Sequence, residues 1–483
     1  MKRVVFLACL MTAFFVVGGA SPPGHSESKW SNVGRSAKDM KLTVSSNGRY
    51  LVDQDGTPFF YLGDVAWTLL KRLNHEQVDD YLNNRLAKGF TVIHAYVLRG
   101  LEVPNLYGDL TLMDRDPAKP NDAFFRNVDF IVNRANELGL VVGLVVTYGE
   151  HVRQTRTNEQ VFTPSNAFAY GKFLGERYKD YAVVWLLGGD RVAAEDEAVW
   201  TAMAKGLKEG SRGTQLVSYH GPGPQAGVTG YSSSFWLHNA DWLDFNMIQS
   251  GHRWGTLNYE FITHDYNLKP AKPTIDMEPR FENHHTGMDV IRRIGPHQVR
   301  EAAYWNMLAG AAGHGYGCND IFQFYDPGST KPSYRDGSYP FGTWYATTHW
   351  QKAMDFEGAF DMGHLRKLFE LRPWYQMVPD QSLIAMGQGS GEDHIQAARA
   401  EDGSFLVAYL PFGNRIGVHM DKLTAPRLKA QWYDPRQGSW VAIGEYTNRG
   451  IREFVPPSNG EMNDWVLVIE DQTKNYPTEL PSK

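Results

Sequence analysis

The stretch Leu140-Val141-Val142-Gly143-Leu144-Val145-Val146 carries the clearest fold signal in the sequence, because no position in it is polar. Uniform apolarity of this kind indicates a strand buried on both faces, as in parallel sheets that helices cover. The preceding residues, 124–138, place apolar side chains at helical spacing until Gly139, and glycine is a common helix stop. Residues 124–146 therefore predict a helix that leads into a buried parallel strand.

The same alternation of helices and short apolar strands extends over residues 59–317. We expect eight strands, at residues 59–64, 90–98, 140–146, 182–187, 216–220, 245–249, 273–278 and 314–317. This α/β span of roughly 250 residues matches the size of a (β/α)8 TIM barrel. A doubly wound open sheet is the alternative, but the Gly-rich fingerprint typical of that fold does not follow the first strand.

The first 20 residues have the organisation of a secretory signal peptide. Met1-Lys2-Arg3 is basic, Val4–Val17 is apolar, and small residues lead to Ala20, where we expect cleavage. The apolar run is shorter than the ~20 residues of a spanning helix. We therefore expect export to the periplasm or the medium, with no stable membrane insertion. Without the signal, Cys318 is the only cysteine, which rules out an intramolecular disulfide.

Three further segments are expected in the mature chain. Residues 21–58 form an N-terminal segment with short hairpins, signalled by Asn47-Gly48 and Asp55-Gly56. Residues 59–372 form the barrel, and residues 373–483 form a small C-terminal antiparallel β-sandwich domain. The pattern leaves open whether the early hairpins join the sheet of this C-terminal domain.

Composition limits the classes of partner. The 483 residues include 48 basic and 54 acidic side chains, for a net charge of −6. Because nucleic-acid binders carry basic patches, we expect no nucleic-acid partner. Aromatic residues make up 13% of the chain and suit either a core or platforms for sugar rings. The sequence has no His-Glu-x-x-His, paired Cys-x-x-Cys or calcium-loop pattern, so we expect no metal or other cofactor. It makes no prediction about oligomeric state.

Polar residues at the carboxyl ends of barrel strands are the candidates for an active site. In chain order these residues are Asp64, His94, Tyr148 with Glu150, Asp190, His220, Gln249, Glu278 and His314. Asp190 and Glu278 follow the fourth and seventh strands, whose ends face each other across the mouth of an eight-stranded barrel. Two opposed carboxyl groups are what glycoside hydrolysis requires.

Structural roles compete with this interpretation. Either carboxylate could instead cap a helix or pair with Arg191 or Arg280. Asp276 shares a strand face with Glu278 but lies ~6.6 Å deeper, so we expect it to be a buried support.

Other residues near the strand ends have less specific signals. Among Trp67, Tyr148, Trp185 and Trp236, we expect two at most to stack on sugars, since most aromatic residues belong to cores. The His284-His285 pair is expected in a loop, with its imidazoles pointing apart.

Several of these stretches together resemble one enzyme family. They are residues 47–53 and 58–67, residues 81–82 with 88–93, Val184-Trp185-Leu186-Leu187-Gly188-Gly189-Asp190, Asp276-Met277-Glu278-Pro279, and residues 432–438. The chain resembles the apiosidase-like glycoside hydrolases of family 140, whose C-terminal β domain is of a collagen-binding type.

The resemblance implies a barrel enzyme that cleaves apiosyl linkages in the side chains of the pectin rhamnogalacturonan II. It implies Asp190 as general acid/base and Glu278 as nucleophile, with a retaining mechanism and carboxyl groups ~5–5.5 Å apart. The residues expected to contact the oligosaccharide or polysaccharide substrate are Asp64, Trp67, His94, Tyr148, Trp185, His220, Gln249 and Arg280. The alternatives are a glycosidase acting on another plant or bacterial glycan, and a barrel that binds carbohydrate without cleaving it.

Overall fold

A computed structural model describes residues 36–38, 40–154, 160–194, 196–224, 231–287, 289–330 and 344–480. The expected signal peptide lies outside these residues. Eight parallel strands form the central sheet: β4 (Tyr61–Val65), β5 (Val92–Leu98), β6 (Val141–Thr147), β7 (Val183–Leu187), β8 (Val217–Tyr219), β9 (Asn246–Ile248), β10 (Thr274–Asp276) and β13 (Gly313–Gly317). Their order is β8-β7-β6-β5-β4-β13-β10-β9. At the two ends of this order, the Ser218 hydroxyl donates to the Phe245 carbonyl at 2.7 Å, which brings β8 beside β9. The sheet is thus a nearly closed barrel, which confirms the predicted (β/α)8 fold over the open sheet.

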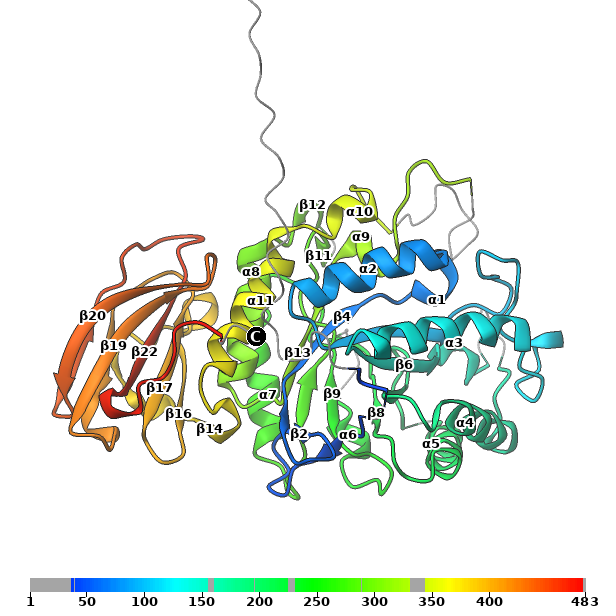
Figure 1. Cartoon of the computed structure of the whole chain (residues 1–483), viewed down its shortest axis with the longest axis horizontal. Coiled ribbons are helices and arrows are strands. Elements are labelled where there is room, and N and C mark those ends of the chain that lie inside the picture. The colour runs from blue at the N-terminus through cyan, green and yellow to red at the C-terminus, as the bar shows by residue number, and fades with distance from the viewer. Residues whose placement is uncertain are drawn as a thin grey trace, which may run out of the picture.

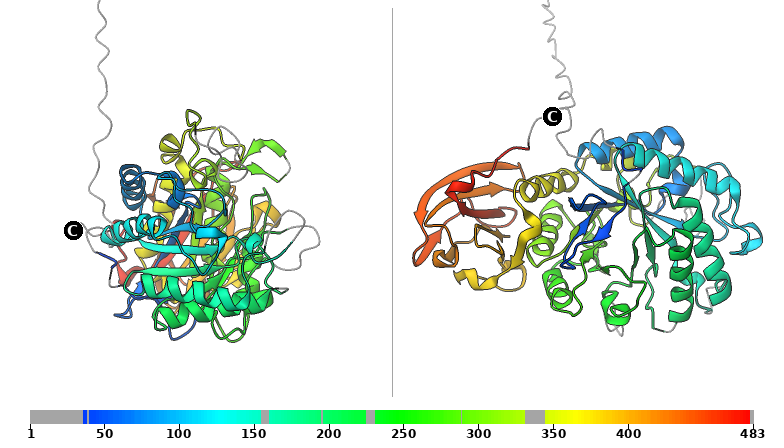
Figure 2. Two further views of the ribbon diagram at one scale, coloured as in Figure 1. Left: turned by 90° about the vertical axis from the view of Figure 1, so that its right-hand side faces the viewer. Right: turned by 60° about the horizontal axis from the view of Figure 1, so that its bottom comes forward.

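Helices surround the barrel on its outside (Figure 1, Figure 2). The long ones are α2 (His75–Ala87), α3 (Asp122–Glu137), α4 (Pro164–Tyr178), α5 (Glu197–Gly210), α7 (Asn258–Tyr266), α8 (Pro296–Leu308) and α11 (Glu357–Glu370). The short ones are α1 (Leu69–Arg72), α6 (Ser234–Leu237), α9 (Asn319–Phe322) and α10 (Trp350–Ala353). A small hairpin of β11 (His285–Thr286) and β12 (Asp289–Arg293) lies in the connection from β10 to α8.

Alternation along the strands divides the buried side chains into two layers. In β4, Tyr61 and Val65 belong to the cluster inside the barrel, whereas Leu62 belongs to the cluster between strands and helices. In β7, Val184 and Leu186 lie inside, and Trp185 lies in the outer cluster. Successive side chains of a strand point to opposite faces, so each residue's place is set by this register.

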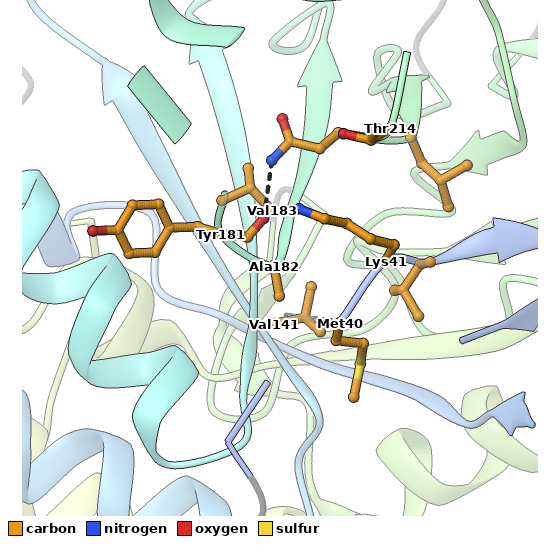
Figure 3. Close-up of a pocket in the computed structure, with 10 residues that line it drawn as sticks. Met40, Lys41, Val141, Tyr181, Ala182, Val183 and Thr214 are labelled. Carbon is orange, nitrogen blue, oxygen red and sulfur yellow. Dashed lines mark hydrogen bonds between the residues drawn. The ribbon is translucent and has the colours of Figure 1, made fainter. Parts of the chain in front are cut away.

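The N-terminal segment packs at the end of the barrel where its strands begin, which is here called the lower end. Strands β1 (Thr43–Val44), β2 (Leu51–Val52) and β3 (Pro58–Phe59) form an antiparallel sheet of their own, separate from the sheets of the C-terminal domain. In Figure 3, Met40 and Lys41 lie beside Val141, Ala182 and Val183 at the start of two barrel strands, around a space of only about 10 Å³. The Lys41 ammonium donates to the Lys179 carbonyl at 2.7 Å. This space between described residues is too small for a sugar ring, and the active sites of barrel enzymes lie at the opposite end, where the strands finish.

The C-terminal domain is an antiparallel sandwich, as predicted. Its larger sheet has the order β14 (Met377–Pro379), β16 (Gln396–Ala400), β17 (Phe405–Leu410), β22 (Trp465–Asp471), β19 (Arg427–Asp434) and β20 (Ser439–Thr447). Its smaller sheet has β15 (Ile384–Met386), β18 (Ile416–His419) and β21 (Ile451–Phe454). Leu406 and Leu467 pack between the two sheets, whereas Val407 and Tyr409 join the barrel's outer cluster. The domain therefore packs directly against the barrel, beside α8 and α11 (Figure 1).

The described ranges contain helices of at most 16 residues, the length of α3. None of them is both long and apolar enough to cross a membrane.

Candidate active site

A cavity of about 220 Å³ lies at the carboxyl ends of the barrel strands. Its walls contain the two carboxylates that the sequence singles out, together with aromatic and basic side chains. The lining residues are Trp67, Tyr96, Arg99, Tyr148, Asp190, His252, Glu278, Phe281, His284, Phe322 and Trp344.

Asp190 reaches the cavity because two glycines allow a tight turn after β7. Gly188, Gly189 and Asp190 all have positive φ, at 92°, 50° and 63°. A Cβ on Gly188 would lie 2.2 Å from the His220 carbonyl oxygen, and one on Gly189 would lie 2.6 Å from that of Thr147. Only glycine tolerates both the conformation and the close approach. The Gly-Gly-Asp sequence thus packs Asp190 between the ends of β6 and β8.

Glu278 lies two residues beyond β10, in a segment anchored from below. The Asp276 carboxylate is fully buried and accepts hydrogen bonds from the Ser250 hydroxyl at 2.6 Å and the Asn306 amide at 3.0 Å. The Glu278 carbonyl accepts from the Gly251 amide at 3.0 Å. Asp276 therefore has the supporting position expected for it, beneath Glu278.

The buried imidazole of His220 lies between the two carboxylates. Its Nδ1 is 3.2 Å from an oxygen of Asp190, and its Nε2 is 3.1 Å from an oxygen of Glu278. The Nε2 of His252 approaches the other Glu278 oxygen at 3.1 Å. Neither nitrogen of His220 is aligned for a hydrogen bond with its carboxylate, so these contacts are charge pairs at close range.

The two carboxylates control the charge of His220. Burial by itself lowers the pKa of His220, but the two carboxylates outweigh burial and raise it to about 10. Burial by itself raises the pKa of Glu278, and His220 with His252 outweighs it and holds that pKa well below its ordinary value. At neutral pH the site therefore holds an imidazolium ion beside an ionised Glu278.

Asp190, His220 and Glu278 form the one cluster of acidic and histidine ligand atoms found within the described ranges that could surround a metal ion. Their ligand atoms lie within 4.8 Å of one another. A protonated imidazole has no free lone pair, because both of its nitrogens are donors. A metal ion could bind His220 only by displacing its proton, and without that exchange the imidazolium lies between the two carboxyl groups.

The remaining walls of the cavity are aromatic. The Arg99 guanidinium lies 3.4 Å from the centre of the Tyr148 ring, and the Trp67 ring meets the Tyr96 ring at 4.8 Å. Trp67 also contacts the His220 ring edge-on at 5.6 Å. Flat apolar walls around two carboxylates suit a ring that is apolar on its faces and polar at its edges.

Four of the predicted site residues line this cavity: Asp190, Glu278, Trp67 and Tyr148. His220 lies directly behind the two carboxylates. The competing pairings are wrong, because Arg191 pairs with Glu150 at 2.8 Å and Arg280 pairs with Glu301 at 2.6 Å.

Asp64 and Trp185 lie in the outer layer, between strands and helices, so we no longer propose that they bind substrate. Asp64 is fully buried, 2.7 Å from Arg85, and accepts a hydrogen bond from the Tyr81 hydroxyl. Trp185 is fully buried and donates to Gln215 at 2.7 Å. Both belong to the strand face that points toward the helices, so neither can contact a ligand in the mouth.

His94, Gln249 and Arg280 also lie away from the cavity lining. His94 is buried within the barrel, where its Nε2 lies 2.7 Å from the Tyr61 hydroxyl, and burial lowers its pKa to about 3. Gln249 lies against Gly223 on the rim. Arg280 is buried in its pair with Glu301. These three residues support the walls rather than line the cavity.

Three polar lining residues were not among the predicted ones. Arg99 directly follows the second strand, so the rule that selects polar residues at strand ends could have identified it. His252 and His284 lie on loops, and their rings are 4.2 Å apart. The expectation that the His284 and His285 imidazoles point apart is wrong, since their centres are 4.4 Å apart.

Comparison with known proteins gives matches over nearly the whole chain. The family model "Apiosidase-like, catalytic domain" matches residues 45–376. The model "Putative collagen-binding domain of a collagenase" matches residues 378–470.

Two solved structures are similar to the chain over its full architecture. One is a glycoside hydrolase with 32% identity and a TM-score of 0.82, which covers 92% of this chain and 99% of its own. The other is a family 5 glycoside hydrolase from Bacteroides vulgatus ATCC 8482, with 32% identity, a TM-score of 0.83, and coverage of 93% and 98%. A search of curated proteins found no match.

Proposed function

The chain belongs to the apiosidase-like glycoside hydrolases, and on that premise we propose that it cleaves apiosyl linkages in the side chains of rhamnogalacturonan II with retention of configuration. The observation that carries the proposal is the pair Asp190 and Glu278, with carboxylate oxygens within 4.8 Å of each other at the cavity. Retaining enzymes have carboxyl groups ~5–5.5 Å apart, and inverting enzymes ~6.5–9.5 Å. The short separation supports attack by a carboxylate rather than by a water held between the two.

We assign the nucleophile to Glu278. Its low pKa keeps it ionised, and His252 and His220 hold it from two sides. In the first step, a Glu278 oxygen attacks the anomeric carbon and forms a glycosyl-enzyme ester. Its side chain is only 8% exposed, which suits a group that meets only the sugar.

We assign the general acid/base to Asp190. Its side chain is 26% exposed, so it can reach both the departing oxygen and the water that enters later. Asp190 gives its proton to the leaving oxygen in the first step and removes one from water in the second. The adjacent imidazolium of His220 balances the negative charge of Glu278 before substrate arrives.

The size and walls of the cavity support a single small sugar as the group bound there. Its volume of about 220 Å³ is below the ~300–1,000 Å³ of pockets for larger ligands. Trp67 and Tyr148 provide the aromatic surfaces, and Arg99 adds a cation beside Tyr148. An apiosyl unit is a ring of that size, with hydroxyl groups at its edge.

The test is incubation of rhamnogalacturonan II with the wild type, Asp190→Ala and Glu278→Ala. We expect new apiosyl reducing ends from the wild type alone, with the first product in the configuration of the substrate by NMR. Release of the opposite anomer would overturn retention. Absence of release, together with cleavage of another plant or bacterial glycan, would overturn the apiosyl specificity.

We further propose that the enzyme is exported, because residues 1–20 have the organisation of a cleaved signal. Cell fractionation should place the protein in the periplasm or the medium. N-terminal sequencing should begin at Ser21. An intact Met1 on the protein recovered from cells would contradict cleavage.

A further inference from the structure

A second cavity, of about 250 Å³, lies where the barrel meets the C-terminal domain. The barrel contributes Trp254, Arg292 and Glu301, and the C-terminal domain contributes Glu392, Phe412 and Glu461. Because both domains supply walls, the cavity exists only in the assembled chain.

The junction that forms this cavity is rigid. Arg300, next to Glu301 on α8, donates two hydrogen bonds of 2.8 Å to the buried Asp464 of the C-terminal domain. On the opposite side Glu392 lies against Gly255, where an added Cβ would be 2.9 Å from its Oε1. Both walls are therefore held at a fixed separation.

Several buried polar atoms of the lining residues lack a hydrogen-bond partner. They are the Nε1 of Trp254, the Nε2 of His297 and the Oε1 of Glu301. His297 and Glu301 are each only 3% exposed, and the other oxygen of Glu301 is occupied by Arg280. Buried polar groups are normally paired, so this arrangement fits a ligand that supplies both donors and acceptors.

The lining has the chemistry of a sugar site. Trp254 and Phe412 provide aromatic surface, and carboxylates accept hydrogen bonds from hydroxyl groups. Three glutamates and one arginine line the cavity: Arg292 lies 3.5 Å from the centre of the Trp254 ring, and Arg280 pairs with Glu301 from outside the lining. The remaining negative charge disfavours a uronate, so a neutral sugar fits best. The glutamates are not in the one metal-compatible cluster of the described ranges.

The cavity is linked to the catalytic centre by a short segment. His252 contacts Glu278, and Trp254 follows two residues later, at most about 7 Å along the chain. The Trp254 amide donates to Thr286, and the Gly287 amide donates to the His252 carbonyl. One loop therefore contributes a wall to each cavity.

We propose that this second cavity is a distal subsite that binds a neutral sugar residue of the same glycan whose linkage is cleaved at Asp190 and Glu278. The inference rests on the proposed function, because it makes the two cavities parts of one substrate path. It gives the C-terminal domain a role in substrate recognition.

The first test is calorimetric binding of rhamnogalacturonan II oligosaccharides to full-length mature Glu278→Gln protein. Adding Trp254→Ala or Phe412→Ala should weaken binding about 10-fold. Phe360→Ala, at an exposed phenylalanine of α11, is the matched control and should bind normally. Unchanged affinity in the two cavity variants, or no binding by the Glu278→Gln parent, would overturn the subsite.

The second test separates the subsite from the catalytic proposal. In otherwise wild-type protein, Trp254→Ala and Glu461→Gln should raise KM for the polysaccharide about 10-fold and leave kcat/KM for a short aryl apioside unchanged. Glu453→Gln, at an exposed residue of β21, is the control for Glu461. Equal loss on the long and the short substrate would overturn a distal site. Trp254-dependent binding without apioside cleavage would support the subsite and overturn only the catalytic proposal.

Discussion

Two buried clusters in this enzyme have the same charge pattern, one cation between two carboxylates. In the junction between the domains, Arg300 lies between Asp361 and Asp464, with N–O distances of 2.8 Å. In the active site, His220 lies between Asp190 and Glu278 at 3.2 and 3.1 Å. Both cations are buried.

The clusters differ in how many hydrogen bonds the carboxylate oxygens accept from the cation. Arg300 donates aligned hydrogen bonds to both partners, and Asp464 also accepts from the Tyr409 hydroxyl at 3.0 Å. His220 makes contacts that are close but not aligned, and its partners line a cavity. Guanidinium stays charged at any ordinary pH, whereas imidazole can release its proton. Aligned bonds to a permanent cation stabilise the fold, whereas incomplete pairing next to open space leaves carboxylates available for chemistry.

The largest effect should come from the carboxylates of the active-site cluster. Asp190→Asn and Glu278→Gln keep the shape of each side chain but remove proton transfer or nucleophilic attack. We expect kcat/KM to fall by about 10³-fold or more, with an unchanged circular dichroism spectrum. Activity above a tenth of the wild type in either variant would exclude that residue from the catalytic pair.

Breaking the junction cluster should affect stability instead. Arg300→Met leaves two buried carboxylates without their cation, so we expect a loss of about 3–5 kcal/mol in the free energy of unfolding. Urea denaturation measures this loss. Arg415→Met removes an exposed pair with Glu453 and should cost less than about 1 kcal/mol. Equal losses in the two variants would refute the stabilising role of Arg300.

Replacing the cation of the active-site cluster should change the pH profile. In His220→Gln, Glu278 loses one of the two histidines that hold its pKa low, so the acid limb of kcat/KM should move up by about one pH unit or more. A merely structural role for His220 would lower stability but leave this limb in place. Rate profiles from pH 3 to 8 distinguish the two.

The same histidine predicts an alkaline limit in the wild type. Its folded pKa of about 10 is above its ordinary 6.5. The stability that the charged form contributes is therefore complete below about pH 6.5 and is lost as the pH rises through about 10. Thermal melting from pH 7 to 11 should show this loss, and His220→Gln should show a smaller one.

The smallest effect on activity is expected at a residue that the sequence suggests as a sugar platform. Trp185→Phe removes the bond to the buried Gln215 and should cost about 1–2 kcal/mol of stability. Since Trp185 faces the helices, KM should stay within about twofold of the wild type. A large rise in KM with unchanged stability would contradict that orientation.

The barrel was predictable because its strands are short, apolar and regularly separated by amphipathic helices. Which way a residue near a strand end points was less predictable. Asp64 still belongs to β4, where alternation with Tyr61 and Val65 turns it outward. Asp190 lies beyond β7, after two glycines with positive φ that break the alternation. A shift of one residue in the end of a strand reverses the direction of a side chain. The ends of strands cannot be predicted from sequence to within one residue.

Other features depend on contacts between distant segments. His252 and Glu278 come from different loops, and their approach reflects the Gly251 amide bonded to the Glu278 carbonyl. The place of the early hairpins was equally non-local, because Met40 and Lys41 pack against the first residues of strands that lie about 100 to 140 residues further along the chain. Contacts of this kind, between segments far apart in the sequence, cannot be predicted from the pattern of neighbouring residues.

The short connection between α11 and β14 has a mechanical consequence. Only residues 371–376 join them. The buried Arg300–Asp464 pair fastens the domain to the barrel, and the buried Arg372–Glu470 pair fastens the connection itself to the domain. The C-terminal domain is therefore not joined by a flexible linker that would let it hold a polysaccharide while the barrel moves independently. The molecule must approach a polysaccharide as one stiff body, and each encounter presents the sandwich and the barrel mouth in the same relative orientation.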